Sequence, residues 1–356
     1  MSAARQPTAI RSLRLGGLST RVRPRRLGVA IAATAAAALI AILSLGTGDY
    51  TLSPAEVAAA LLGHGDRRDL LVVQVVRLPR ILTGLAVGAA LAIAGAITLT
   101  TARNTLATPD LLGVTGGASA GAVAVITLGG TASASGVLRE IGVPTAALGG
   151  ALVASALVVL LTGRTRLTGI RPLLVGLGVT AFFTGVINLL LIVAPIKDAA
   201  RANVWLTGSL NQRSWPEFWP VVTALAVGVI ILVPLAHRLG ALHLGPDVAR
   251  ALGTAPGPTA LVLLVVAGAL TAVSAAAVGP LGFVALVAPH AARLATGASH
   301  PPLAASAAVG ALFVAASDLV ARTAFAPITL PAGAVVAIVG GPVLAALLIT
   351  RFGRRA

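Results

Sequence analysis

Residues 81–101, ILTGLAVGAALAIAGAITLTT, form an apolar run without a single charged side chain. A helix needs about 20 such residues to cross the roughly 30 Å hydrocarbon core of a bilayer. Comparable runs recur along the 356-residue chain, which is 57% hydrophobic and only 10% charged. One soluble core of this length could not bury so many apolar side chains. The sequence therefore predicts an all-α, polytopic membrane protein.

Charged residues and Pro/Gly-rich breaks divide the apolar sequence into about ten predicted transmembrane helices. These spans are residues 28–46, 81–101, 111–128, 145–163, 172–194, 218–236, 259–278, 281–294, 303–321 and 333–350. The run at 281–294 is short and contains Pro289, which is typical of a broken helix buried among its neighbours. Inverted five-helix repeats are also expected, because the Gly/Pro-interrupted stretches 104–121 and 279–293 hold corresponding places in the two halves.

Glycines recur every four residues in two of these predicted spans. Gly84 and Gly88 form one such series, and Gly113, Gly117 and Gly121 form the other. Small residues at this spacing let helix backbones approach closely within a membrane. Close helix packing is favoured over a pore-lining role for them.

The formal net charge is +16, and the arginines lie between the apolar runs. Alternate connections are rich in arginine and poor in acids, as the positive-inside rule expects. The first run is longer than the core of a signal peptide and is expected to be retained. We predict a multi-pass protein of the inner membrane with a basic cytoplasmic tail (1–27), a transmembrane permease domain (28–350) and a cytoplasmic C-terminus (351–356). Since the arginine placement explains the charge and aromatic residues make up only 3%, nucleic acid is not an expected partner.

Several catalytic classes are disfavoured by the residues themselves. Cysteine is absent, and the single lysine, Lys197, does not stand in the Gly-Lys-Ser/Thr of a phosphate-binding loop. Ser119 lies in Gly-Ala-Ser-Ala-Gly, but the nucleophile-elbow pattern needs a strand–turn–helix context and this one lies in an apolar run. Neither a cofactor nor a metal site is expected. The sequence favours a transport subunit without its own ATPase site.

Asp318 is the acidic residue that lies within a predicted span, where ionisable groups are costly. Arg322 follows it by one helical turn, so an ion pair is favoured over proton coupling. His290, near Arg293, is likewise expected to be structural rather than a proton relay. A proton-coupled secondary transporter stays open as the alternative from a different class.

Several separated blocks resemble the FecCD/BtuC type of ABC importer permease, which serves iron-siderophore and cobalamin uptake. The blocks are Arg77-Leu78-Pro79-Arg80 with residues 87–95, Arg103-Asn104-Thr105-Leu106 with 109–113, then 205–210, 279–290, and Asp318 to Arg322 with Leu330-Pro331. The chain looks most like permeases for ferric enterobactin-type siderophores. Haem and cobalamin are the alternative substrates within the family. Thr105 and Thr329 depart from the family pattern, which has proline and an acid at these places.

The resemblance implies partners and residue roles. The partners are a cytoplasmic ABC ATPase dimer, a second permease subunit (identical or related), an extracytoplasmic siderophore-binding protein and membrane lipid. Docking of the binding protein falls to outward-facing Arg77, Arg80 and Arg322. Residues 244–257 are expected to form a cytoplasmic segment that couples the permease to the ATPase, with a glycine turn between two short helices. The coupling residues in it are Asp247, Ala249, Arg250 and Gly253. The residues expected to line the cytoplasmic gate and the translocation path are Asn104, Leu106, Thr168 and Gly169.

Overall fold

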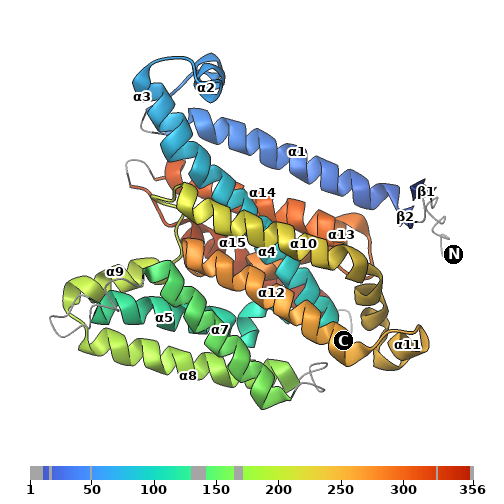
Figure 1. The fold of residues 1–356 in the computed structure, drawn as a ribbon. Helices are drawn as coiled ribbons and strands as arrows, with labels where there is room; N and C mark the ends of the chain where they lie inside the picture. Colours follow the sequence, from blue (N-terminus) through green and yellow to red (C-terminus); the bar gives the residue numbers. More distant parts are fainter. Residues whose placement is uncertain are drawn as a thin grey trace.

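The computed structural model describes residues 11–15, 18–48, 50–129, 142–163, 171–325 and 328–352, and most of them are helical (Figure 1). The ten helices that match the predicted spans are α1 (Pro24–Gly46), α4 (Leu78–Ala102), α5 (Val114–Leu128), α7 (Val143–Thr162), α8 (Arg171–Val193), α10 (Trp215–Leu244), α12 (Pro256–Val278), α13 (Val284–Thr296), α14 (Leu303–Thr323) and α15 (Ala332–Phe352). The shorter helices are α2 (Pro54–Leu61), α3 (Arg67–Leu70), the π-helix η1 (Leu71–Arg77), the 3-10 helix η2 (Pro109–Leu112), α9 (Ile196–Leu206) and α11 (Pro246–Ala251). An antiparallel hairpin of β1 (Arg11–Leu15) and β2 (Leu18–Val22) lies in the basic tail.

Among the described residues, seven helices are long and apolar enough to cross a membrane. The apolar stretches Val114–Leu128 and Ala332–Ala346 are shorter, and α13 has only 13 residues. As predicted for the short eighth run, α13 contains Pro289 and is largely buried. These findings confirm the prediction of an all-helical, polytopic membrane protein.

Helix α4 runs through the centre of one group of helices, in contact with α10, α12, α13 and α14 (Figure 1). In the apolar stretch of the span Arg67–Ala102, which includes α4, 83% of the residues are buried. The corresponding share is 17% in each of α1, α8 and α10. A second group consists of α5, α7, α8 and α9, and α12 contacts both α5 and α7 of this group. The outer helices therefore leave large apolar faces that lipid or another subunit can cover.

Glycines set the closest helix contacts, as their spacing predicted. A Cβ atom on Gly88 of α4 would lie 2.3 Å from the carbonyl oxygen of Gly310 on α14. A Cβ on Gly117 of α5 would lie 2.3 Å from the carbonyl oxygen of Gly150 on α7. Both contacts are below any van der Waals distance, so only glycine fits at these crossings. Gly113 has a different use, because its φ of +79° ends η2 and starts α5.

The second predicted span begins earlier than expected, because the helix continues from Arg67 to Ala102 rather than starting at residue 81. Proline lacks a backbone N–H and normally interrupts an α-helix. Here Pro79 is the second residue after η1, and the backbone N–H of the intervening Leu78 donates to the carbonyl of Val73. The wider π turn carries the chain up to the proline, and π turns are frequent at functional sites. Arg77 and Arg80 consequently lie within a helix and not in an external connection.

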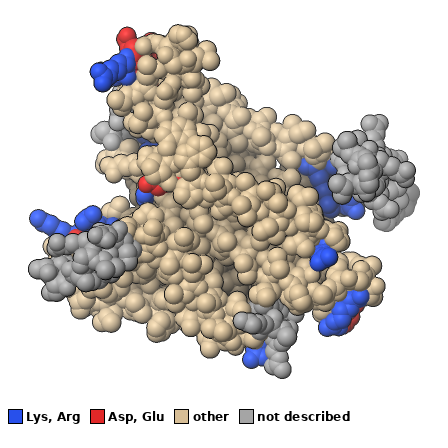
Figure 2. All heavy atoms as spheres, in the orientation of Figure 1, with Lys and Arg blue, Asp and Glu red and all other residues tan. Residues whose placement is uncertain are grey.

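Charged side chains gather at the two ends of the bundle and leave an apolar band between them (Figure 2). We call one of them the arginine-rich end; it carries Arg23, Arg25, Arg103, Arg238, Arg250 and Arg293, together with Asp247. We call the other the mixed-charge end; it carries Asp66, Arg67, Arg68, Asp69, Asp198, Arg201, Arg213 and Glu217. An apolar band between two polar rims is the surface that a bilayer requires.

Candidate functional site

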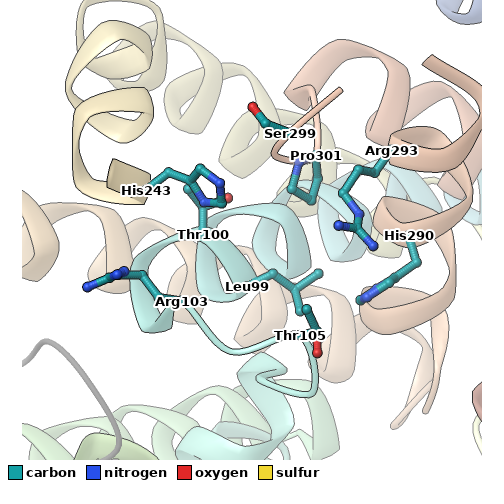
Figure 3. A pocket seen from close by; sticks show the side chains of 9 residues that line it. All are labelled: Leu99, Thr100, Arg103, Thr105, His243, His290, Arg293, Ser299 and Pro301. Carbon is teal, nitrogen blue, oxygen red and sulfur yellow. The ribbon is translucent and has the colours of Figure 1, made fainter. Parts of the chain in front are cut away.

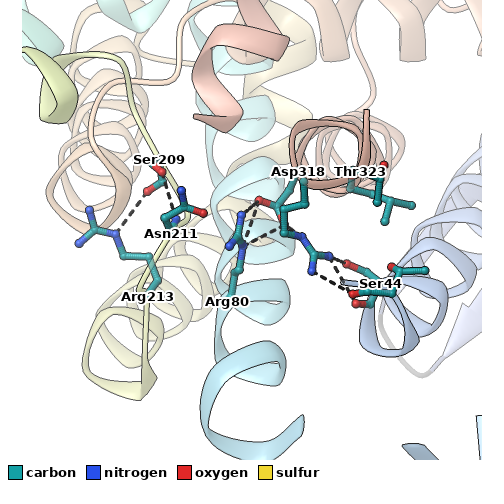
Figure 4. A network of polar contacts seen from close by, with 10 residues as sticks. Ser44, Arg80, Ser209, Asn211, Arg213, Asp318 and Thr323 are labelled. Carbon is teal, nitrogen blue, oxygen red and sulfur yellow. Dashed lines mark hydrogen bonds and ion pairs between the residues drawn. The ribbon is translucent and has the colours of Figure 1, made fainter. Parts of the chain in front are cut away.

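A buried ion cluster joins three helices near the mixed-charge end (Figure 4). Asp318 of α14 is 3% exposed. Arg80 of α4 donates to it from Nη2 at 2.7 Å and from Nε at 3.2 Å. Arg322, one turn along α14, places its Nε 3.3 Å from the second carboxylate oxygen. The predicted pair of Asp318 with Arg322 is therefore present, but the shorter contact is the one with Arg80.

Arg322 also connects the cluster to the end of α1. Its Nη2 donates to the side-chain hydroxyl of Ser44, and its Nη1 lies 3.4 Å from the carbonyl oxygen of Thr47. Both groups belong to the segment where α1 ends. One guanidinium thus links α14 to α1 while it neutralises a buried carboxylate.

Arg77 does not face outward in this structure, contrary to the expectation for a docking residue. It is 6% exposed, its Nη1 donates to the carbonyl of Leu45 at 2.6 Å, and its Nη2 donates to the carbonyl of Tyr50. Leu45 lies in the last turn of α1 and Tyr50 in the loop that follows, where carbonyl groups need hydrogen-bond donors. Arg77 therefore holds the loop after α1 against the long helix that continues into α4.

Three backbone segments cross beside this cluster, and each comes from a different sequence block. A Cβ on Gly208 would lie 2.2 Å from the carbonyl oxygen of Pro280, and a Cβ on Gly333 would lie 2.0 Å from that of Thr207. The amide of Gly333 donates to the carbonyl of Gly208 at 3.0 Å. Only glycines allow such close crossings. The structure thus brings together blocks 205–210 and 279–290 and the chain after Leu330-Pro331.

The predicted coupling segment forms one short helix at the arginine-rich end. Helix α11 follows Gly245 and precedes a turn at Gly253, whose φ is +76°. Ala249 is fully buried, whereas Asp247 and Arg250 form an exposed ion pair of 2.6 Å. The expectation of two short helices was wrong, because the chain after Gly253 enters the long helix α12 at Pro256.

The predicted gate residues are described only in part. Asn104 follows α4, and its side-chain oxygen accepts a hydrogen bond from the backbone N–H of Leu106 at 3.0 Å. This local turn leaves the Leu106 side chain 41% exposed at the arginine-rich end. Thr168 and Gly169 lie outside the described residues, so their relation to Asn104 stays a prediction.

The hydrolase pattern at Ser119 lacks the required context. Ser119 is buried in the middle of α5, and the residues around it are helical. A nucleophile elbow holds its serine on a strained turn at the edge of a sheet. Ser119 is one of the small buried residues of this helix.

Comparison with known proteins decides the family. The model of the FecCD transport family matches residues 36–350. The chain belongs to the FecCD transport family. It is 36% identical over 326 residues to the ferric enterobactin transport system permease protein FepG of Escherichia coli, covering 91% of this chain and 97% of that protein. It is 34% identical over 317 residues to the iron(3+)-hydroxamate import system permease protein FhuG of Bacillus subtilis, covering 87% and 93%.

The fold also agrees with that of a solved ABC transporter structure. A metal-chelate type ABC transporter in an inward-facing conformation has a TM-score of 0.78 and 27% sequence identity. The match covers 91% of this FecCD chain and 99% of the other. Family membership confirms the resemblance predicted from the sequence blocks. It also confirms a transport subunit, not an enzyme.

Proposed function

We propose that this FecCD protein is the permease subunit of an ATP-driven importer for ferric siderophores. The observation that carries the proposal is the family match over residues 36–350, together with the relatives FepG and FhuG, whose names specify ferric enterobactin and iron(3+)-hydroxamate. The ten helices that overlap the predicted spans support ten membrane crossings in two inverted halves. In Figure 1 the hairpin of β1 and β2 and the start of α1 lie toward the side that carries α11, which supports a cytoplasmic N-terminal tail.

An ABC ATPase dimer docks at the arginine-rich end through α11 in this proposal. Buried Ala249 fixes α11 to the bundle, while Asp247 and Arg250 are exposed for contact with a partner. Movement of α11 can pass directly into α10 and α12, because α11 contacts both of them. Asn104, Leu106, Thr168 and Gly169 form the gate on the same side. A second permease subunit, identical or related, covers part of the exposed apolar faces, and lipid covers the remainder.

A siderophore-binding protein docks at the mixed-charge end. Arg77, Arg80 and Arg322 contribute through their field. Arg80 and Arg322 share the single carboxylate of Asp318, which leaves one positive charge in excess in this ion cluster. The field therefore attracts an acidic surface and speeds its encounter with the permease.

Uptake of radioiron-labelled ferric enterobactin tests this function. Cells that express the chain with its ATPase and binding protein should accumulate label, and uptake should stop when the phosphate-loop lysine of the ATPase is replaced. Unlabelled ferric siderophore should compete, whereas haem and cobalamin should not. Uptake that survives the lysine replacement and follows the proton gradient would instead support the secondary transporter. The structure argues against that alternative, because Asp318 is held by two arginines.

A further inference from the structure

A cavity of about 440 Å³ lies at the arginine-rich end, between the ends of α4 and α10 and the connection from α13 to α14 (Figure 3). We call it the basic pocket; its polar lining includes Arg103, Arg293, His243, His290, Thr100 and Ser299. The two arginines carry positive charge, and the imidazole and hydroxyl groups can donate hydrogen bonds. Of the described residues, no acidic one lines the cavity. Neither the coupling role nor the docking role accounts for this composition.

The positions of the two arginines are set by the local backbone. Arg103 ends α4 with φ of +52°, a left-handed conformation that is uncommon for residues other than glycine. Its guanidinium lies beside Gly245, since a Cβ placed on that glycine would be 3.4 Å from Arg103 Nη1. Arg293 comes from α13, across the cavity from the end of α10 (Figure 3). Strained conformations of this kind cluster at binding sites.

The histidines are also held in defined orientations. His290 is 5% exposed, and its Nδ1 lies 3.0 Å from the carbonyl oxygen of Leu286. Because a carbonyl only accepts, Nδ1 carries the hydrogen and donates it. In Figure 3 the side chains of His290 and Arg293 lie next to each other on one side of the pocket, and His243 lies near Thr100.

Further basic residues surround the pocket. The ring of His300 lies 5.7 Å from that of His243, centroid to centroid. Burial lowers the pKa of His300, and the charges of Arg26 and Arg23 lower it further, although a hydrogen bond to the carbonyl of Pro301 acts in the opposite direction. The Nε of Arg26 is buried without a hydrogen-bond partner among the described residues. Like charges gathered at partly buried positions repel one another, and an anion would relieve this repulsion.

We propose that the basic pocket binds a phosphate-type oxyanion, supplied by the headgroup of an anionic phospholipid. Phosphate oxygens accept the paired N–H groups of arginine and the hydrogens of hydroxyl and imidazole groups. The pocket lies between helix ends, which is the depth of the headgroups, and basic pockets between transmembrane helices recruit anionic lipids. The lipid source rests on the proposed cytoplasmic placement of this end, whereas binding of the anion itself does not.

A substitution pair at Ser299 tests the proposal with little risk to the fold, because this residue lies exposed in the connection after α13. Ser299→Asp adds a carboxylate to the acid-free lining, and Ser299→Asn adds a side chain of the same size without charge. The full chain in its complex is titrated with dioleoylphosphatidylglycerol against a dioleoylphosphatidylcholine background, and binding is read by native mass spectrometry and thermal shift. We expect Ser299→Asp to weaken phosphatidylglycerol binding about tenfold, which is the order of one lost charge-assisted hydrogen bond. Ser299→Asn should stay near the wild type.

The arginines supply a second comparison. The double substitution Arg103→Gln with Arg293→Gln should abolish the lipid-dependent shift, whereas Arg238→Gln should preserve it. Arg238 is an exposed arginine at the same end of α10 and does not line the pocket. Should the double variant fail to fold, the Ser299 pair still decides the matter.

A parallel titration with inorganic phosphate in phosphatidylcholine identifies the source of the anion. A shift with phosphatidylglycerol alone that Ser299→Asp reduces supports the lipid headgroup. A shift with phosphate alone that Ser299→Asp reduces keeps the oxyanion site but overturns the lipid source. If Ser299→Asp and Ser299→Asn bind both probes equally, the proposal is refuted. Because these readouts measure binding, they are independent of whether ferric siderophores are the transported substrate.

Discussion

Arg80 and Asp318 are 238 residues apart in the sequence, yet Arg80 Nη2 lies 2.7 Å from Asp318 Oδ1. The contact joins the central helix α4 to α14, and Arg322 approaches the same carboxylate from the other side. A carboxylate enclosed by two guanidiniums serves as a structural connection between helices. It is poorly placed to exchange protons with a translocation path.

Asp318→Asn should destabilise the protein by about 3 kcal/mol or more, because Arg80 and Arg322 would keep their buried charges without a compensating carboxylate. Chemical or thermal unfolding in detergent measures the change. Asp198→Asn is the control, since its ion pair with Arg201 is longer, at 3.6 Å, and Arg201 is 76% exposed. The control should change stability by about 0.5 kcal/mol or less. Equal effects of the two substitutions would contradict a structural role for Asp318.

Gly88→Ala should destabilise the contact between α4 and α14 by about 1–3 kcal/mol, the usual cost of overpacking. The new Cβ would meet the Gly310 carbonyl oxygen at 2.3 Å, and a backbone atom cannot move aside as a flexible side chain can. Gly149→Ala in α7 is the matched control, because no atom lies within 4 Å of the corresponding Cβ. The control should stabilise its helix by roughly 0.5–1 kcal/mol, as alanine has the higher helix propensity. A melting temperature raised by both substitutions would argue against this crossing.

Hydropathy and small-residue spacing predicted much of the fold, because membrane spans and helix crossings are properties of local sequence. Arg77 shows where prediction from the sequence failed. Charge and Pro79 indicated an external connection, but the π turn before the proline lets the helix begin at Arg67. Such a change in hydrogen-bond register has no simple pattern of residue types. The direction of the Arg77 side chain was therefore also missed.

The sites were predictable to different degrees. The pair of Asp318 with Arg322 follows from helical spacing alone, whereas the shorter contact with Arg80 depends on how α4 packs against α14. The basic pocket was even harder to predict from the sequence, because Arg103, His243 and Arg293 come from three distant segments. No local motif links residues that only tertiary packing brings together.

Arg80→Gln should slow association of the binding protein by roughly two- to tenfold at low salt, since it removes one of the three arginines near the proposed docking face. The difference from the wild type should shrink at high salt, where the field is screened. Arg238→Gln removes the same charge at the opposite end and should leave the rate unchanged. Association is measured by surface plasmon resonance on the intact complex. Rates that match the wild type at low salt would exclude the docking role.

Gly253→Val should lower transport-coupled ATP hydrolysis while membrane insertion stays intact. We expect this effect to come from backbone strain and not from a steric clash. The φ angle of Gly253 is +76°, and no atom lies within 4 Å of a Cβ placed there. A β-branched residue is strained in this conformation by about 1–2 kcal/mol, and relief of the strain would shift α11 relative to α12. Gly253→Asn separates the two explanations, because asparagine tolerates the left-handed conformation and is similar in size to valine. ATPase activity in proteoliposomes with loaded binding protein should therefore fall for valine and remain near the wild type for asparagine. Equal losses for both would show that the surface of the turn, rather than its conformation, transmits the movement of the ATPase.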